Sequence, residues 1–259
     1  MSRRPRLPAA AALGLGLVLT GCVLTGAPGA TAPDETRTLT VFAAASLKAT
    51  FTDLGERFEA AHPGVTVAIN FAGSQTLVEQ LDQGATADVL ATADEATMAA
   101  AVAAGLVTSE PIAFVANQLT IVVPPGNPAG VTGFADLADP GLKLVVCAPV
   151  VPCGAATQQV AQTAGVALTP VSEEQAVSDV LAKVQAGEAD AGLVYATDAR
   201  AATGTVEEVS FPESAAVTNR YPIAVLAAAA DPELAAGFLD LVTGPQGRAV
   251  FERAGFRQP

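Results

Sequence analysis

An apolar strand pattern passes into a helix start within the stretch Leu39-Thr40-Val41-Phe42-Ala43-Ala44-Ala45-Ser46-Leu47. The same order returns at Val65–Phe71, which leads to Ser74 and a second amphipathic pattern, and a third strand pattern follows at 87–92. Strands that alternate with helices predict an α/β fold built on mostly parallel sheets with helices on both faces. Ligands of such sheets bind beyond the carboxyl ends of the strands, which is where Ser46 and Ser74 fall.

Each of these serines admits two interpretations. The first turn of a helix carries unpaired N–H groups and a partial positive charge, so a hydroxyl there is well placed to bind an anion. Alternatively, Ser46 and Ser74 are only N-caps, a role that serine fills in many helices without any ligand. Because parallel strands would deliver both serines to one edge of the sheet, the pair favours a site for one small anion.

The charge balance limits the class of ligand and the way it is held. The chain carries 13 Lys and Arg against 26 Asp and Glu, which gives a formal net charge of −13. Such an acidic chain argues against nucleic acid as a partner, because phosphates are bound through basic patches. An anion must then be held by local dipoles and hydrogen bonds, each of which contributes about 1.5–3 kcal/mol when it reaches a charged group.

The N-terminus is typical of an export signal. Three arginines precede an uncharged stretch at 7–24, and the segment Leu19-Thr20-Gly21-Cys22 resembles the bacterial lipobox, whose Cys becomes the lipidated first residue of the mature protein. We therefore expect a signal peptide at 1–21, a lipidated Cys22 with a tether over 22–37, and an extracytoplasmic protein anchored to the cell membrane by lipid. A plain transmembrane anchor is the alternative, since 18 uncharged residues reach the lower length limit for a span.

Three cysteines occur in the chain, and lipidation of Cys22 leaves Cys147 and Cys153 as the remaining pair. An exported protein permits a disulfide, and this one would fix the shape of the short loop between the two residues. A metal site is disfavoured because the spacing is not Cys-x-x-Cys and the single histidine is His62. A redox role stays open but has no support in the sequence.

The second half of the chain repeats the alternation of strands and helices. An extended run at 114–123 suits a crossing between two lobes, and a second extended run at 219–226 would carry the chain back. Between them the patterns predict a short helix at 134–137, a strand at 142–147, helices after Gly154 and from about Glu173 to Ala186, and a strand at 191–195. Two helices at 231–242 and 245–254 are expected to pack on the first lobe.

Several motifs give the chain a resemblance to a known family. They are Val41-Phe42-Ala43-Ala44-Ala45-Ser46-Leu47, Phe71-Ala72-Gly73-Ser74, Ala87-Asp88-Val89, Val151-Pro152-Cys153-Gly154, Gly192-Leu193-Val194-Tyr195-Ala196-Thr197-Asp198-Ala199 and Tyr221-Pro222-Ile223. With them the chain resembles the periplasmic molybdate-binding proteins of ABC importers over nearly all of residues 38–257. The resemblance implies a type II periplasmic-binding-protein fold, with lobe 1 at 38–117 plus 220–259, lobe 2 at 118–219, and a two-segment hinge.

The resemblance also implies the ligand and its contacts. One molybdate or tungstate oxyanion would lie between the lobes, held by Ser46 and Ser74 of the first and by Cys153, Val177 and Tyr195 of the second. The family often has Ala where Cys153 stands, so Cys153 would act through its backbone N–H, as would Val177, and Tyr195 through its phenol. From pattern alone, Val177 is a core residue of an amphipathic helix and Tyr195 a packed tyrosine that ends a buried strand.

Carboxylates are expected to stay out of the site, because a carboxylate that faces a dianion repels it. Asp88, Asp94 and Asp198 are therefore interpreted as caps or as groups behind the contact residues. Selection against phosphate would follow from a pocket that only donates hydrogen bonds, since a protonated phosphate would bury an unpaired O–H. Selection against sulfate must come from size.

These patterns lead to one main hypothesis and two alternatives. The main one is a monomeric binding lipoprotein without a cofactor that captures molybdate, closes its lobes and docks on an ABC permease. A serine hydrolase is disfavoured, because the chain has no Gly-x-Ser-x-Gly elbow, no phosphate loop and no His-Glu-x-x-His, and His62 belongs to no motif. A receptor for another oxyanion, such as sulfate or phosphate, on the same fold stays open.

Overall fold

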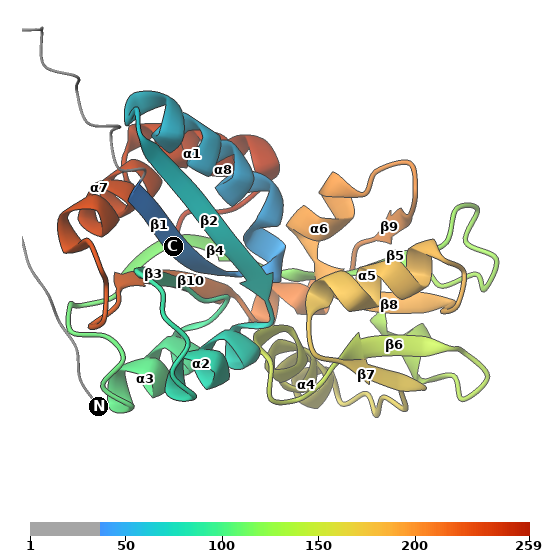
Figure 1. The fold of residues 1–259 in the computed structure, drawn as a ribbon. Helices are drawn as coiled ribbons and strands as arrows, with labels where there is room; N and C mark the ends of the chain where they lie inside the picture. The colour runs from blue at the N-terminus through green and yellow to red at the C-terminus, as the bar shows by residue number, and fades with distance from the viewer. Residues whose placement is uncertain (1–36) are drawn as a thin grey trace, which may run out of the picture. The chain divides into compact units, whose positions relative to one another are not determined.

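The computed structural model describes residues 37–259, in which ten strands form two five-stranded sheets. The predicted signal peptide, Cys22 and nearly all of the tether lie outside the described residues. Among residues 37–259, no helix combines the length and the apolar character that a membrane span requires. Each sheet and the helices around it form one lobe of an α/β fold (Figure 1).

The first sheet has the strand order β2-β1-β3-β10-β4. Its strands are β1 (Arg37–Ala44), β2 (Val65–Ala72), β3 (Val89–Ala91), β4 (Ile112–Asn117) and β10 (Asn219–Val225). Parallel pairing joins β1 to β2 and to β3, whereas β10 runs antiparallel between β3 and β4. Four of the five strands therefore point the same way, as the alternating pattern predicts.

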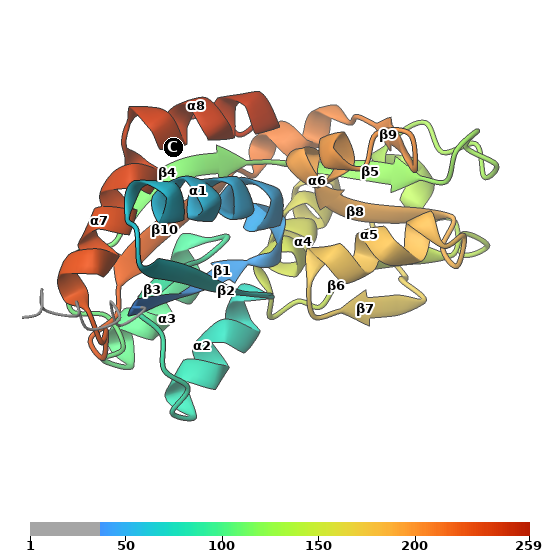
Figure 2. The same ribbon diagram turned by 45° about the horizontal axis from the view of Figure 1, so that its top comes forward.

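Helices cover both faces of the first sheet (Figures 1 and 2). On one face lie α1 (Lys48–Ala61), α7 (Pro232–Thr243) and α8 (Pro245–Ala254), and on the other lie α2 (Ser74–Asp82) and α3 (Glu95–Ala103). Alternate side chains of a strand point to opposite faces. Accordingly, Val41 belongs to the larger core with Phe51 and Phe238, and Phe42 belongs to the smaller core with Leu77. The two C-terminal helices thus pack on the first lobe, as expected.

The second sheet has the order β7-β6-β8-β5-β9. Its strands are β5 (Leu119–Val123), β6 (Leu144–Cys147), β7 (Ser172–Glu174), β8 (Ala191–Tyr195) and β9 (Glu207–Val209), and only β5 runs against its neighbours. The helices of this lobe are α4 (Pro152–Ala164), α5 (Val177–Gln185) and α6 (Ala196–Ala201). Three short 3-10 turns complete the elements: η1 (Ala45–Leu47), η2 (Phe134–Ala138) and η3 (Pro212–Ala216).

The chain passes between the two sheets at two neighbouring places. The run predicted at 114–123 is not one strand, because β4 ends at Asn117 in the first sheet and β5 begins at Leu119 in the second. The return occurs at the start of β10, where Asn219 pairs with Asn117 in the antiparallel ladder of β10 and β4. Both crossings therefore lie side by side at the end of one ladder.

Two helices begin at residues other than those predicted. The helix expected after Gly154 begins at Pro152, whose ring suits the first helical position. The helix expected from about Glu173 begins at Val177, because residues 172–174 pair with β6 as the edge strand β7. Both differences matter for the site, since they put Cys153 and Val177 in the first turns of their helices.

Candidate functional site

A cavity of about 20 Å³ lies between the two lobes and is lined by all five predicted contact residues, Ser46, Ser74, Cys153, Val177 and Tyr195. Its other lining residues are Ala44, Ala45, Gly73, Ala93, Val151, Pro152, Gln175 and Ala176. None of the thirteen carries a charge. The cavity lies where β1, β2 and β8 end, which is the carboxyl edge that parallel sheets use for ligands.

Three helices begin at this cavity. Ser74 is the first residue of α2, Cys153 the second of α4 and Val177 the first of α5. Backbone N–H groups in the first turn have no acceptor within their own helix, and the helix dipole adds partial positive charge there. Three converging helix starts therefore supply N–H donors and a positive potential without any cationic side chain.

The three hydroxyl groups at the cavity already have a hydrogen-bond partner behind them. Ser74 Oγ accepts from the backbone N–H of Ala93 at 3.0 Å, and the phenol oxygen of Tyr195 accepts from Nδ2 of Asn219 at 3.1 Å. Because an accepting hydroxyl keeps its own hydrogen, Ser74 and Tyr195 retain an O–H to donate. Ser46 Oγ lies 3.0 Å from the phenol oxygen of Tyr221, and either of these two hydroxyls can be the donor.

Neither serine acts as an N-cap. Gly73 occupies the N-cap position of α2 and Ala44 that of η1, and no side-chain cap bond forms at either helix start. The capping interpretation of the sequence is therefore wrong for both residues. Their hydroxyls instead contact groups far along the chain, at Ala93 and Tyr221.

Both tyrosines of the chain lie at this site, with their ring centroids 5.8 Å apart in an edge-to-face arrangement. Burial raises the pKa of Tyr195 well above its usual value, and the neighbouring phenol of Tyr221 raises it further. Burial also raises the pKa of Tyr221, against hydrogen bonds with Ser46 and Asn117 that lower it. Both phenols therefore keep their protons at neutral pH and can serve only as neutral donors or acceptors.

A disulfide closes the loop that leads to α4. Cys147, at the end of β6, is bonded to Cys153, and within the loop the N–H of Val151 donates to the carbonyl of Ala148 at 3.0 Å. Gly154 is packed so closely that a Cβ there would lie 1.9 Å from the Ala148 carbonyl oxygen. The loop is thus tied at both ends, while the N–H of Cys153 belongs to the open first turn of α4.

The three aspartates discussed above have structural partners and do not line the small cavity. Asp88 accepts from the N–H groups of Thr40 and Ala230, each at 2.7 Å, and Asp94 caps α3 through the N–H of Thr97 at 2.9 Å. Asp198 accepts from the N–H of Tyr195 at 3.2 Å. Burial raises the pKa of Asp198 to about 7, against that backbone hydrogen bond, which lowers it.

Histidine and metal-binding clusters have no part in this site. His62 stacks on Phe58 at the end of α1, with its Nδ1 2.8 Å from the Phe58 carbonyl oxygen, and it does not line the cavity. Among residues 37–259, no group of three or more His, Cys, Asp or Glu side chains is arranged to hold a metal ion.

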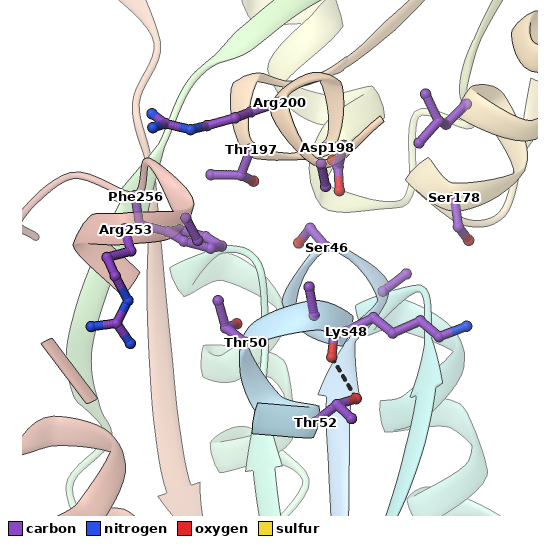
Figure 3. Close-up of a pocket in the computed structure, with 15 residues that line it drawn as sticks. Ser46, Lys48, Thr50, Thr52, Ser178, Thr197, Asp198, Arg200, Arg253 and Phe256 are labelled. Atoms are coloured by element: carbon purple, nitrogen blue, oxygen red, sulfur yellow. Dashed lines mark hydrogen bonds between the residues drawn. The ribbon is translucent and has the colours of Figure 1, made fainter. Parts of the chain in front are cut away.

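A second, larger cavity of about 700 Å³ adjoins the small one and shares Ala45 and Ser46 with it (Figure 3). It lies between η1, the start of α1 and the end of α8 on the first lobe and α5 and α6 on the second. Lys48, Arg200 and Arg253 line it, together with the carboxylate of Asp198. In contrast to the small cavity, this one is rich in cationic side chains.

Sequence reasoning missed four residues of the site. Tyr221 and Asn219 bond two of the hydroxyls from β10, and Gly73 packs against the carbonyl oxygen of Gln175 beside the small cavity. The motifs already contain Gly73 and Tyr221, but no spacing rule connects them with Ser46 or Gln175. The available signal was the pair Asn219 and Tyr221, two polar side chains that are buried two residues apart on one strand and therefore need hydrogen-bond partners.

Comparisons with known proteins identify the family of the chain. Residues 39–257 match the family model described as bacterial extracellular solute-binding protein. The molybdate-binding protein ModA of Mycobacterium tuberculosis is 48% identical over 244 residues, covering 94% of each chain. ModA of Escherichia coli is 32% identical, covering 91% of this chain and 95% of its own.

Solved structures share the fold. The periplasmic molybdate-binding protein of Azotobacter vinelandii matches with a TM-score of 0.73 at 20% identity, covering 85% of this chain and 99% of its own. The sulfate-binding protein SubI of Mycobacterium tuberculosis also gives a TM-score of 0.73, at 22% identity, covering 86% of this chain and 87% of its own. With the family match and the two ModA relatives, the chain belongs to the family of bacterial extracellular solute-binding proteins.

Proposed function

We propose that this protein is an extracytoplasmic lipoprotein that binds molybdate between its lobes and delivers it to an ABC permease. The observation that carries the proposal is the uncharged cavity, where Ser46, Ser74, Cys153, Val177 and Tyr195 meet and three helices begin. The similarity to ModA proteins along nearly the whole chain supports molybdate as the ligand. Tungstate, a near-isosteric dianion, is proposed as a second ligand.

The orientation of the hydroxyls supports selection for an anion that carries no proton. Ser74 and Tyr195 accept hydrogen bonds from other residues, so each keeps an O–H that it can donate to the ligand, and backbone N–H groups can only donate. A fully deprotonated tetrahedral oxyanion satisfies such donors. Phosphate at neutral pH carries a proton, whose O–H would be buried without an acceptor at a cost of about 1–3 kcal/mol.

Closure of the lobes is part of the proposed mechanism. The donors divide between the lobes, with Ser46 and Ser74 on the first and Cys153, Val177 and Tyr195 on the second. All of them reach one ion only when the lobes approach, so the ligand stabilises the closed state. We propose lobe 1 at 38–117 plus 220–259 and lobe 2 at 118–219, with the crossings at the ends of β4 and β10 as the hinge.

Calorimetric titration with molybdate, tungstate, sulfate and phosphate tests the ligand. We expect molybdate and tungstate to bind, and phosphate to bind about 5- to 150-fold more weakly, as the unpaired O–H implies. Tyr195→Phe should weaken molybdate binding about 10- to 100-fold, because it removes one hydrogen bond to a charged group. Thr203→Val on the surface is the matched control, since the Thr203 hydroxyl donates to the carbonyl of Arg200 and does not line the small cavity. Tight binding of sulfate or phosphate with none of molybdate would instead assign a different oxyanion receptor.

Lipid attachment and permease delivery need separate tests. Cys22→Ala should abolish incorporation of labelled palmitate and move the protein from the membrane fraction to the medium or the periplasm. Labelling that survives this substitution would contradict the proposed lipidation site. A strain that lacks the protein should recover molybdate uptake with the wild-type gene and not with a gene for a variant that does not bind molybdate.

A further inference from the structure

The acidic charge of the protein creates a difficulty for the capture of an anion. At a formal net charge of −13, the surface repels a dianion at long range, and the small cavity contains no cation that would offset this. Hydrogen bonds and helix dipoles act only over the last few ångströms. Cationic side chains close to the site would offset this repulsion and raise the rate at which the ion arrives.

Cationic side chains gather in the larger cavity beside the site. The chain has 13 Lys and Arg residues, three of which are the arginines of the signal peptide, so ten belong to residues 37–259. Three of these ten, Lys48, Arg200 and Arg253, line this one cavity, and Asp198 is its only acidic lining residue. In Figure 3, Lys48 lies on one side of Ser46, Arg200 and Arg253 lie on the other, and the charged ends of all three point outward from Ser46.

These cations are not neutralised by close ion pairs. Among the described residues, no carboxylate lies within ion-pair distance of Lys48 or Arg200, and Arg253 has only Asp53 at 4.0 Å. Asp53 already holds Arg57 through two hydrogen bonds of 2.7 and 3.1 Å. All three cationic side chains are exposed, so their field extends into the solvent of the cavity.

The cavity is also in the right place to serve the small site. Ala45 and Ser46 line both spaces, so the η1 turn forms a common wall. The larger space is about 700 Å³ and leaves room for a hydrated ion, whereas the smaller is about 20 Å³ and leaves none for a shell of water around an ion. Both spaces lie between the lobes and change together when the lobes separate.

From this arrangement we propose that the larger cavity is a cationic vestibule, in which Lys48, Arg200 and Arg253 attract small oxyanions and set the rate at which they reach Ser46. This inference rests on the proposed function of the neighbouring site and assigns to it a separate element for association. The three side chains raise the association rate constant, whereas the uncharged donors determine how long the ion stays. Asp198 works against this attraction whenever it is ionised.

Stopped-flow kinetics can separate the two roles. The chain has no tryptophan and both of its tyrosines lie at the site, so we would follow molybdate binding by tyrosine fluorescence, after calibrating the signal against calorimetry. The variants are Lys48→Gln, Arg200→Gln and a triple variant that adds Arg253→Gln. Arg248→Gln is the matched control, because it removes the same charge from α8 outside the cavity.

The expected effect is on association and depends on salt. A unit charge that lies about 8 Å from the path of a dianion changes the encounter rate about twofold at 0.15 M ionic strength. At 0.01 M, where screening is weaker, the same charge changes the rate about fourfold. Each single variant should show this loss in the association rate constant, the triple variant a larger one, and the control almost none. The dissociation rate constant should stay unchanged in all of them.

Three results would overturn the proposal. One is a triple variant that associates as fast as wild type at 0.01 M ionic strength. Another is a loss of affinity that comes from faster dissociation and not from slower association, which would mean that the cations contact the bound ion directly. The third is the absence of any molybdate binding by wild type in calorimetry, which removes the proposed function together with its vestibule and is therefore distinguishable from the first two.

Discussion

A glycine at the interface between the lobes offers a direct test of closure. Gly73 precedes α2, and a Cβ built on it would lie 2.0 Å from the backbone carbonyl oxygen of Gln175. Gln175 belongs to the other lobe and stands two residues before Val177. The backbone of Gly73 has φ −58° and ψ 139°, which alanine adopts without strain. Gly73→Ala should therefore be tolerated whenever the lobes are apart and be resisted when they are closed.

The size of the effect follows from the contact distance. Real Cβ contacts stay beyond 3.0 Å, so the two backbones must separate by about 1 Å, and both contact groups belong to the main chain. A hydrogen bond of ordinary length that is stretched by this amount no longer counts as one. If two of the donors on the second lobe lose their bonds to the ion, the loss is about 3–6 kcal/mol, or about 10²- to 10⁴-fold in affinity.

The assay compares Gly73→Ala with Gly133→Ala by calorimetry and by thermal melting. Gly133 also stands before a short helix, and a Cβ there would meet no atom within 4 Å. Without molybdate, both variants should melt within a few degrees of wild type, since N-cap and chain-entropy effects of a glycine-to-alanine change are each about 1 kcal/mol or less. With molybdate, only Gly73→Ala should lose affinity. Wild-type affinity in Gly73→Ala, or an equal loss in both variants, would refute the reasoning.

Three further predictions follow from hydrogen bonds, burial and the disulfide. Ser74→Ala should weaken molybdate binding and also lower the melting temperature of the empty protein, because it leaves the Ala93 N–H unpaired at a cost of about 1–3 kcal/mol; an unchanged melting temperature would contradict the observed bond. Asp198 has a pKa of about 7 when folded and 3.8 as an unperturbed group, so the folded state binds the extra proton and stability falls as pH rises from about 4 to about 7. Asp198→Asn should remove this dependence on pH, so the difference in melting temperature between the variant and wild type should rise from pH 5 to pH 8. A difference that stays constant over this range would show that the carboxyl titrates normally. The double variant Cys147→Ser with Cys153→Ser should lose less than about 3 kcal/mol of stability, because the closed loop is short, but should weaken molybdate binding, as titration would reveal.

Local patterns predicted the strands that are continuous apolar runs and the helices that bury one face. The strand at 191–195 and the helix that follows Ser46 coincide with β8 and α1, since apolar periodicity and chain breakers act within a few residues. The start of α5 was predicted too early. Residues 172–174 became a strand through pairing with β6, and such a pairing between distant segments leaves no signal in a short apolar pattern.

Gly154 shows a different reason for a wrong boundary. Because glycine is a helix breaker, the start of α4 was predicted after Gly154, which is too late. In the structure Gly154 lies in the first turn of α4, because only a residue without a Cβ fits against Ala148. The site could be anticipated only as a set of contact residues. The partners that orient them, Ala93, Asn219 and Tyr221, are set by tertiary contacts over 19 to 175 residues of sequence.

The pairing of Asn117 with Asn219 limits how the two lobes can move. Both connections leave the first sheet from adjacent positions of the same ladder, so neither can bend without carrying the other with it. A protein joined by a single strand could swivel and twist, but two connections tied together leave rotation about one shared axis as the easy motion. We therefore expect every closure to bring the same donor atoms of the two lobes together. The hinge would in this way determine how precisely those donors are placed around the ligand.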